Sequence, residues 1–169
     1  EDFKAFHERV RKGASEAYIA SRGEHFNSKI LAAYLGFPFV EAAEGIIFSE
    51  DGKLLEEETN EKLGALMMKH PRAVLPGFYG ATANGDVRIF SRGGSDITGS
   101  LVARALKADL YENWTDVNGF LVADPRVVDT PHRIKELTYR ELRELSYMGA
   151  SVLHADAIFP VKKVGIPIN

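Results

Sequence analysis

The sequence predicts an α/β fold, in which helices cover both faces of a mostly parallel sheet. Three observations indicate it: apolar residues recur at helical spacing in several segments, short apolar runs bounded by turn residues lie between them, and the two patterns alternate along the chain. Strands that alternate with helices are typical of a layered fold with a parallel sheet. The chain of 169 residues has the length of one domain with a substantial core.

Two helices are predicted at the start of the chain. The first is indicated by three apolar residues at helical spacing, Phe3, Phe6 and Val10. The second runs from about Ser15 toward Leu35, and Gly36 is expected to end it. One face of this second helix collects large apolar residues, which are Ile30, Leu31, Tyr34 and Leu35.

Strand-like runs surround a third predicted helix. Two short apolar runs, 37–40 and 45–48, come before it, and a buried strand is expected at 72–78 after it. The helix is predicted over 55–69, and its inward residues are Leu63, Leu66 and Met67. Its solvated face is expected to carry four glutamates, Glu56, Glu57, Glu58 and Glu61.

The second half of the chain begins with a predicted hairpin. Asn84-Gly85 is typical of a tight turn and closes a hairpin into 87–90. A helix is expected after Gly94, because apolar residues follow it at helical spacing, namely Ile97, Leu101, Val102, Ala105 and Leu106. A strand is then expected around 110–115, before a loop that ends in Asp124-Pro125-Arg126.

Two more helices are predicted toward the C-terminus. Thr138 and Glu141 have the spacing of a capping box, and the helix that they begin is expected to end at Gly149. The last helix is predicted over 154–163, and 166–168 is expected to begin another strand.

Composition and charge exclude several classes of function. The net charge of −3 argues against a general nucleic-acid binder, which usually carries a basic excess. The absence of cysteine excludes disulfides, thiol catalysis and cysteine-based zinc sites. The longest apolar run, 30–40, is too short to span a bilayer, so no membrane partner is expected. The first residues contain neither an initiator Met nor a signal peptide, and we expect them to lie in the middle of a longer protein.

The stretch Arg92-Gly93-Gly94-Ser95-Asp96 is the most informative part of the sequence for chemistry. Its glycines allow the backbone to approach a ligand closely, and Ser95 or Asp96 can cap the helix that follows. Arg92 adds a planar cation that suits a carboxylate or a phosphate. The alternative is a glycine turn with a capping residue and a surface arginine.

Thr115 and Asp116 follow a predicted strand, at the edge where parallel α/β sheets bind their ligands. A hydroxyl and a carboxylate at this place can hold a nucleotide, and Arg126 can meet its phosphates. The alternative is a loop with an Asx turn that Pro125 ends.

Ser21-Arg22-Gly23-Glu24 is expected to interrupt a helical region. Gly23 can mark a close approach to a ligand, with the Glu24 carboxylate facing an amine, and a plain helix–turn–helix connection is the alternative. The five histidines show no metal-binding spacing, so no metal site built from protein side chains is expected.

Taken together, these segments resemble the aspartate kinase branch of the amino-acid kinase family. The matching segments occur in the family's order and cover nearly the whole chain: 21–24 with 29–35, 76–80, 91–96, 114–117, 123–126, 148–150 and 152–154. The resemblance implies a three-layer αβα sandwich that carries ATP and L-aspartate side by side at one edge of its sheet. It also implies transfer of the γ-phosphoryl of ATP to the aspartate side chain, with Mg²⁺ at the phosphates, in a cytoplasmic homo-oligomer.

The resemblance also assigns roles by position. It implies that aspartate is bound by four residues, Glu24, Phe78, Arg92 and Ser95. Arg92 is expected to hold a substrate carboxylate, and Asp96 is expected to organise the reacting groups. The positions implied for ATP are Thr115, Asp116, Leu121, Arg126, Ser151 and Val152.

The chain departs from the family's pattern in three places. The family's opening strand, a Lys-Phe-Gly-Gly type motif whose lysine bridges the transferred phosphoryl, does not occur in this sequence. An aromatic contact to the nucleotide is lost at Leu121, where Tyr is frequent, and a cation is lost at Ser151, where Lys is frequent. We therefore expect residues 1–169 to be part of a catalytic domain that is inactive alone, without the family's C-terminal ACT domains.

Two alternatives remain open at this point. One is another kinase of the same superfamily that acts on glutamate or UMP, which the combination of 92–96 with 114–117 disfavours. The other is a non-catalytic module that binds a ligand or a partner subunit.

Overall fold

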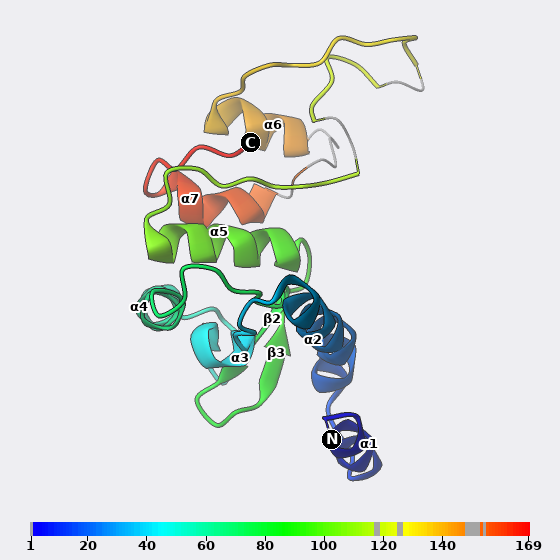
Figure 1. Cartoon of the computed structure of the whole chain (residues 1–169). Coiled ribbons are helices and arrows are strands. Elements are labelled where there is room, and N and C mark those ends of the chain that lie inside the picture. Colours follow the sequence, from blue (N-terminus) through cyan, green and yellow to red (C-terminus); the bar gives the residue numbers. More distant parts are fainter. Residues whose placement is uncertain (1, 117–118, 125–126, 148–152, 154) are drawn as a thin grey trace.

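The computed structural model describes residues 2–116, 119–124, 127–147, 153 and 155–169 (Figure 1). Its elements alternate in the manner of an α/β protein, as predicted. In chain order they are α1 (Asp2–Arg11), α2 (Glu16–Leu35), α3 (Ala42–Gly45), β1 (Ile47–Phe48), α4 (Glu56–Met67), β2 (Tyr79–Thr82), β3 (Val87–Ile89), α5 (Gly94–Leu106), α6 (Tyr139–Tyr147), the 3₁₀ helix η1 (Ala155–Ile158) and α7 (Phe159–Lys162).

The described sheet has three strands in the order β1-β2-β3 and is mixed. β1 pairs with β2 in parallel, and β2 pairs with β3 in the antiparallel hairpin that Asn84-Gly85 predicts. Gly85 has φ 85° and donates its N–H to the Thr82 carbonyl at 2.9 Å, a conformation that suits glycine best. Two isolated parallel bridges, Phe39 with Val74 and Tyr111 with Ile168, add to the parallel pairing.

The buried strand predicted at 72–78 is wrong in its position. Only Val74 makes a bridge there, and the regular strand begins at Tyr79. Pro76 has no N–H to donate to a ladder, and Phe78 adopts φ 60°, which no strand allows. The strand expected around 110–115 is likewise reduced to the Tyr111 bridge, extended by a hydrogen bond from the Asn113 N–H to the C-terminal residue.

Helix α2 has the predicted ends. The Ser15 side chain accepts the Tyr18 N–H at 3.2 Å, and Gly36 ends the helix in the left-handed region with φ 67°. The helix is continuous, so the interruption predicted at 21–24 is wrong, and a Cβ built on Gly23 meets nothing within 4 Å.

The buried face of α2 differs from the apolar face that the sequence suggested. Ile30 is 69% exposed and Tyr34 is 85% exposed. The stripe that faces the sheet is instead largely polar and consists of Tyr18, Ser21, Arg22, His25, Ser28 and Ala32. A helix can bury only one stripe against a sheet, and partners elsewhere in the chain satisfy the polar groups of this one.

Helix α4 buries Leu63 and Met67 as predicted. Glu56, however, does not belong to a purely solvated face, since its carboxylate pairs with Arg104 of α5 at 3.2 Å and also with Lys163, just after α7. Glu56 therefore connects three helices that are far apart in the sequence.

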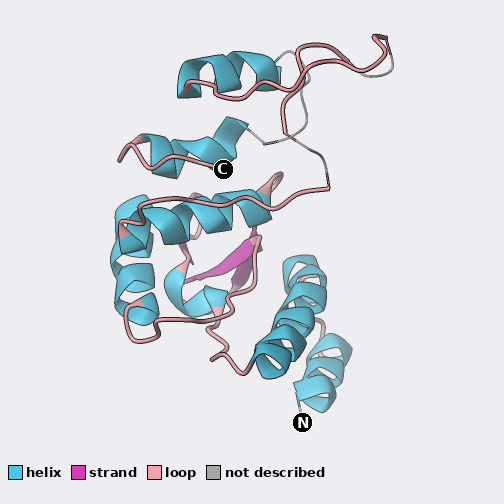
Figure 2. Cartoon of the chain, turned by 45° about the horizontal axis from the view of Figure 1, so that its top comes forward, coloured by secondary structure: helices cyan, strands magenta, loops and turns pink. Residues whose placement is uncertain are grey.

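The helices lie around the sheet in a layered arrangement (Figures 1 and 2). On one side α5, α7 and α6 are stacked in that order, while α3 contacts β2 and α2 contacts β3. The main core lies between these elements and includes Tyr18, Ile46, Phe48, Leu63, Tyr79, Val87 and Leu101. Burial of this apolar surface is what holds the sheet against its helices.

The C-terminal helices also follow the predictions. Thr138 and Glu141 form the capping box, with the Thr138 N–H donating to the Glu141 carboxylate at 2.8 Å. α6 is described to Tyr147, so its predicted end at Gly149 lies outside the described residues. The last predicted helix is present as η1 followed by α7, while His154 lies outside the described residues.

Candidate active site

The glycine turn before α5 determines how that helix begins. Gly93 lies in the left-handed region, with φ 57° and ψ 24°, and is the N-cap of α5. The N-cap residue has no side chain, so the prediction that Ser95 or Asp96 caps the helix is wrong. Both side chains lie in the first turn instead, because the left-handed Gly93 starts the helix earlier. The N–H groups at a helix start favour an anion.

A close approach joins the loop before β2 to the first turn of α5. A Cβ on Gly94 would lie 2.6 Å from the Phe78 Cβ, and a Cβ on Gly77 would lie 2.9 Å from the Ser95 Oγ. Both distances are too short for real atoms, so only glycine allows these backbones to meet. The structure thus brings Phe78 beside Ser95, with Arg92 two positions before Gly94 and exposed.

Phe78 is held in an unfavourable backbone conformation at this contact. Its φ of 60° is rare for a residue with a side chain. Its N–H donates to the Thr98 Oγ1 at 3.1 Å, and its carbonyl accepts the Phe90 N–H at 2.9 Å. Sequence reasoning missed Thr98, although it lies one helical turn after Gly94 on the same helix.

Glu24 lies on α2. Two residues of this helix contact Tyr79 of β2. The Arg22 guanidinium lies 5.3 Å from the centre of the Tyr79 ring, directly after Phe78 in the chain. The His25 Nδ1 lies 3.3 Å from the Tyr79 hydroxyl. Glu24 lies between Arg22 and His25 in the sequence, and its side chain is half-buried.

The positions implied for ATP are only partly described. Thr115 and Asp116 are exposed, and the Thr115 hydroxyl donates to the Asp116 carboxylate at 3.3 Å. Leu121 is half-buried and bridges to Arg133. The other three predicted positions, Arg126, Ser151 and Val152, lie outside the described residues.

Tyr111 connects the two halves of the candidate site. Its ring fills the space beside Gly99 of α5, where a Cβ would collide with it. Its hydroxyl lies 3.3 Å from the Asp96 carbonyl and 3.2 Å from the Asn113 Oδ1, and its single proton serves one of them at a time. Burial, aided by the Asp96 carboxylate, raises the pKa of Tyr111 to about 12. The phenol therefore stays protonated and ties α5 to the segment that leads to Thr115.

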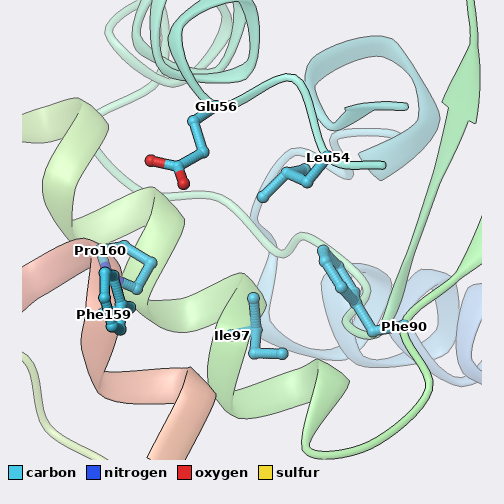
Figure 3. A pocket seen from close by; sticks show the side chains of 6 residues that line it. All are labelled: Leu54, Glu56, Phe90, Ile97, Phe159 and Pro160. Carbon is cyan, nitrogen blue, oxygen red and sulfur yellow. The ribbon is translucent and has the colours of Figure 1, made fainter. Parts of the chain in front are cut away.

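Two cavities of the described residues are lined by other side chains. One of about 180 Å³ is lined by Leu54, Glu56, Phe90, Ile97, Phe159 and Pro160 (Figure 3). The other, of about 460 Å³, is lined by the polar side chains His25, Lys29, Glu41, Glu44, Lys69 and His70 together with apolar ones. Neither contains a predicted site residue, and Arg92 and Ser95 of the candidate site are exposed.

Metal and membrane features are limited in the described residues. No group of three or more His, Asp or Glu side chains is placed there to hold a metal ion. None of the helices described here combines the length and the apolar character that crossing a bilayer requires.

Comparison with known proteins places this chain in a family. Residues 3–169 match the model of the amino acid kinase family. Among curated relatives, Aspartokinase 3 of Bacillus subtilis is 42% identical over 159 residues, which cover 89% of this chain and 35% of that protein. The aspartokinase of Chlamydia pneumoniae is 31% identical over 161 residues, which cover 90% of this chain and 36% of the relative. The chain thus spans about a third of the length of these relatives.

Solved structures give the same result and confirm the predicted fold class. The aspartate kinase of Clostridium acetobutylicum superposes with a TM-score of 0.91 at 56% identity, covering 96% of this chain and 37% of that one. E. coli aspartokinase III, in complex with aspartate and ADP, superposes with a TM-score of 0.83 at 27% identity, covering 99% of this chain and 40% of that one.

Proposed function

Because the chain belongs to the amino acid kinase family, we propose that its protein is an aspartate kinase, which converts ATP and L-aspartate into ADP and 4-phospho-L-aspartate. The observation that carries the proposal is the contact of Phe78 with the first turn of α5, beside the exposed Arg92. Support also comes from the likeness to E. coli aspartokinase III, whose structure contains aspartate and ADP.

Aspartate would bind at this contact. Arg92 would pair with a substrate carboxylate, since its planar fork matches two carboxylate oxygens. Ser95 and the N–H groups of the first α5 turn would add hydrogen bonds, and the Phe78 backbone would border the site. Glu24 would face the substrate amino group from α2, and Asp96 would organise the reacting groups from the first turn of α5.

ATP would bind on the side of Thr115 and Asp116. We extend this site to Leu121, Arg126, Ser151 and Val152, which occupy the positions that the resemblance implies for the nucleotide, although Leu121 and Ser151 lack the aromatic ring and the cation frequent there. Mg²⁺ would accompany ATP. The lack of a three-ligand cluster among the described residues fits this ion, because kinase-bound Mg²⁺ is held mainly by phosphates, water and one or two carboxylates. Asp96 and Asp116 would supply carboxylates for this role, and the ion would neutralise phosphate charge.

The chemistry that the chain must support is mainly positioning. An oxygen of the aspartate side chain attacks the γ-phosphorus, the bond to the bridging oxygen of the β-phosphate breaks, and ADP leaves with that electron pair. The attacking carboxylate is already ionised near neutral pH, so no general base is needed. Arg92 and the N-terminus of α5 would hold the nucleophile and offset its charge near the phosphates.

The wider context follows from the same proposal. Residues 1–169 would form part of an amino-acid kinase catalytic domain in a cytoplasmic homo-oligomer. Its product would enter the biosynthesis of lysine, threonine and methionine.

The full-length gene product tests this function directly. Incubated with ATP, Mg²⁺ and L-aspartate, it should form an acyl phosphate that hydroxylamine traps as the hydroxamate. L-glutamate and UMP are the competing acceptors to compare. Faster phosphorylation of either one than of aspartate would refute the proposal.

A further inference from the structure

Thr98 forms a hydrogen-bonded bridge at the back of the candidate aspartate site. Its side chain belongs to α5 and is 4% exposed. The hydroxyl donates to the Gly94 carbonyl at 2.8 Å and accepts the Phe78 N–H at 3.1 Å. One buried oxygen thus links the glycine turn to the loop that contributes Phe78.

This bridge holds a residue whose backbone conformation is unfavourable. Phe78 has φ 60°, a region that its side chain disfavours, so its local preference is to leave this conformation. Next to it, Gly77 and Gly94 lie so close to Ser95 and Phe78 that a methyl group fits at neither position. A hydrogen bond to the Phe78 N–H therefore fixes how this loop sits against Ser95.

We propose that Thr98 is a positioning residue for aspartate, because it holds Phe78 against the first turn of α5 and so sets the shape of the substrate site. The inference rests on the proposed function. It adds to the proposed aspartate site a residue that shapes the site without touching the substrate. The proposed nucleotide site is built mainly from other segments, led by 115–116, so Thr98 should affect the use of aspartate more than that of ATP.

The variants that test this bridge differ in whether they keep the hydroxyl of Thr98. Valine has nearly the shape of threonine but offers neither donor nor acceptor, so Thr98→Val leaves the Phe78 N–H without its partner. Thr98→Ser keeps both hydrogen bonds. Thr98→Ala is the second variant that removes the hydroxyl, in case valine prevents folding, since it places no methyl group against the Phe78 N–H.

A matched control lies in another helix. Thr59 of α4 is fully buried, and its hydroxyl accepts the Ile47 N–H at 2.9 Å, remote from the candidate site. Thr59→Val therefore removes the same kind of buried hydrogen bond. It should lower the melting temperature without changing the balance between the two substrates.

The first experiment is steady-state kinetics of these variants in the full-length protein. Thr98→Val should lower kcat/KM for aspartate by about 5- to 150-fold, the range expected for one unsatisfied buried donor, with KM for ATP unchanged. Thr98→Ser should restore aspartate use. The proposal is overturned if kcat/KM for aspartate in both Thr98→Val and Thr98→Ala equals that of the wild type. It is also overturned if the KM for ATP rises by the same factor as kcat/KM for aspartate falls, or if Thr98→Ser does not restore the wild-type value.

The second experiment is hydrogen exchange at the Phe78 amide, which needs no kinase activity. Exchange should be faster in Thr98→Val than in the wild type, Thr98→Ser or Thr59→Val. Unchanged exchange in Thr98→Val would refute the bridge, whatever the kinetics. A protein that phosphorylates a different acceptor would refute the proposed function, while this measurement still decides whether Thr98 positions Phe78.

Discussion

The imidazole Nδ1 of His25 lies 2.8 Å from the carboxylate Oε2 of Glu41, in a network that joins α2 to the sheet. The Tyr79 hydroxyl donates to the other carboxylate oxygen at 2.6 Å, and Tyr79 is completely buried. Burial lowers the pKa of His25 more than the Glu41 carboxylate raises it, while burial and Glu41 together raise the pKa of Tyr79. The network includes Tyr79, which directly follows Phe78 in the chain.

The lowered pKa of His25 predicts a pH-dependent stability. Its folded pKa lies below the ordinary value of 6.5, so the folded protein binds fewer protons than the unfolded chain in this range. The contribution of His25 is therefore present above about pH 6.5 and is lost as the pH falls through its folded pKa. Urea unfolding between pH 8 and pH 5 should show this loss, and His25→Gln should reduce it. The exposed His7 provides the control, since His7→Gln should leave the slope unchanged.

Substitution of Arg92 should separate the two substrates of the full-length enzyme. Arg92→Ala removes a charge-assisted pair with a substrate carboxylate, which is worth roughly 1.5–3 kcal/mol, or about 10- to 150-fold in kcat/KM for aspartate. The KM for ATP should change little. Arg143→Ala, which removes an exposed arginine of α6, is the control. An equal loss for both substrates would mean that Arg92 faces the phosphates or serves the fold.

Two glycine substitutions should have opposite effects on stability. Gly94→Ala would place a Cβ 2.6 Å from that of Phe78, and overpacking of this kind costs about 1–3 kcal/mol. Gly23→Ala falls in open space inside a continuous helix and should stabilise the protein by about 0.5–1 kcal/mol. Denaturant unfolding measures both. Gly23→Ala also tests the prediction that a ligand approaches Gly23 closely. A lowered kcat/KM for aspartate in this variant would support that prediction, and an unchanged value would contradict it.

Glu56 should contribute more to stability than a neighbouring glutamate does. It pairs with Arg104, whose side chain is only 10% exposed, and with Lys163, so Glu56→Gln should cost about 0.5–1 kcal/mol. The pair of Glu58 with Lys62 on the same helix is exposed on both sides, and Glu58→Gln should have a smaller effect. Unfolding at low and high salt gives the comparison, and a smaller loss for Glu56→Gln than for Glu58→Gln would contradict this role.

The 169-residue chain alone should show no measurable aspartate kinase activity. A positioned cation at the transferred phosphoryl is worth several powers of ten in rate, and the Lys-Phe-Gly-Gly type motif expected to supply it does not occur in residues 1–169. The chain should also associate, because Ile30 and Tyr34 of α2 are largely exposed. A turnover assay and light scattering decide both points. Robust turnover by a monomeric chain would show that this lysine is not needed.

Local chemistry accounts for the elements that the sequence alone determined. Ser15 and Gly36 begin and end α2, Asn84-Gly85 closes the hairpin, and the pattern from Thr138 starts α6. Each of these signals acts through hydrogen bonds or backbone angles within four residues, so the sequence carries it completely. The resemblance to aspartate kinases likewise named Phe78, Arg92 and Ser95 before their arrangement was visible, and their roles in binding stay predictions.

Only the tertiary structure decided which surfaces meet. The apolar residues of α2 favoured the wrong face, because the burial of Arg22 and His25 depends on Tyr79 and Glu41, which lie far along the chain. The hydrogen bond between Thr98 and Phe78 has the same cause. A threonine inside a helix carries no local signal, and Thr98 acquires its function only because the Phe78 N–H arrives beside it from twenty residues earlier in the sequence.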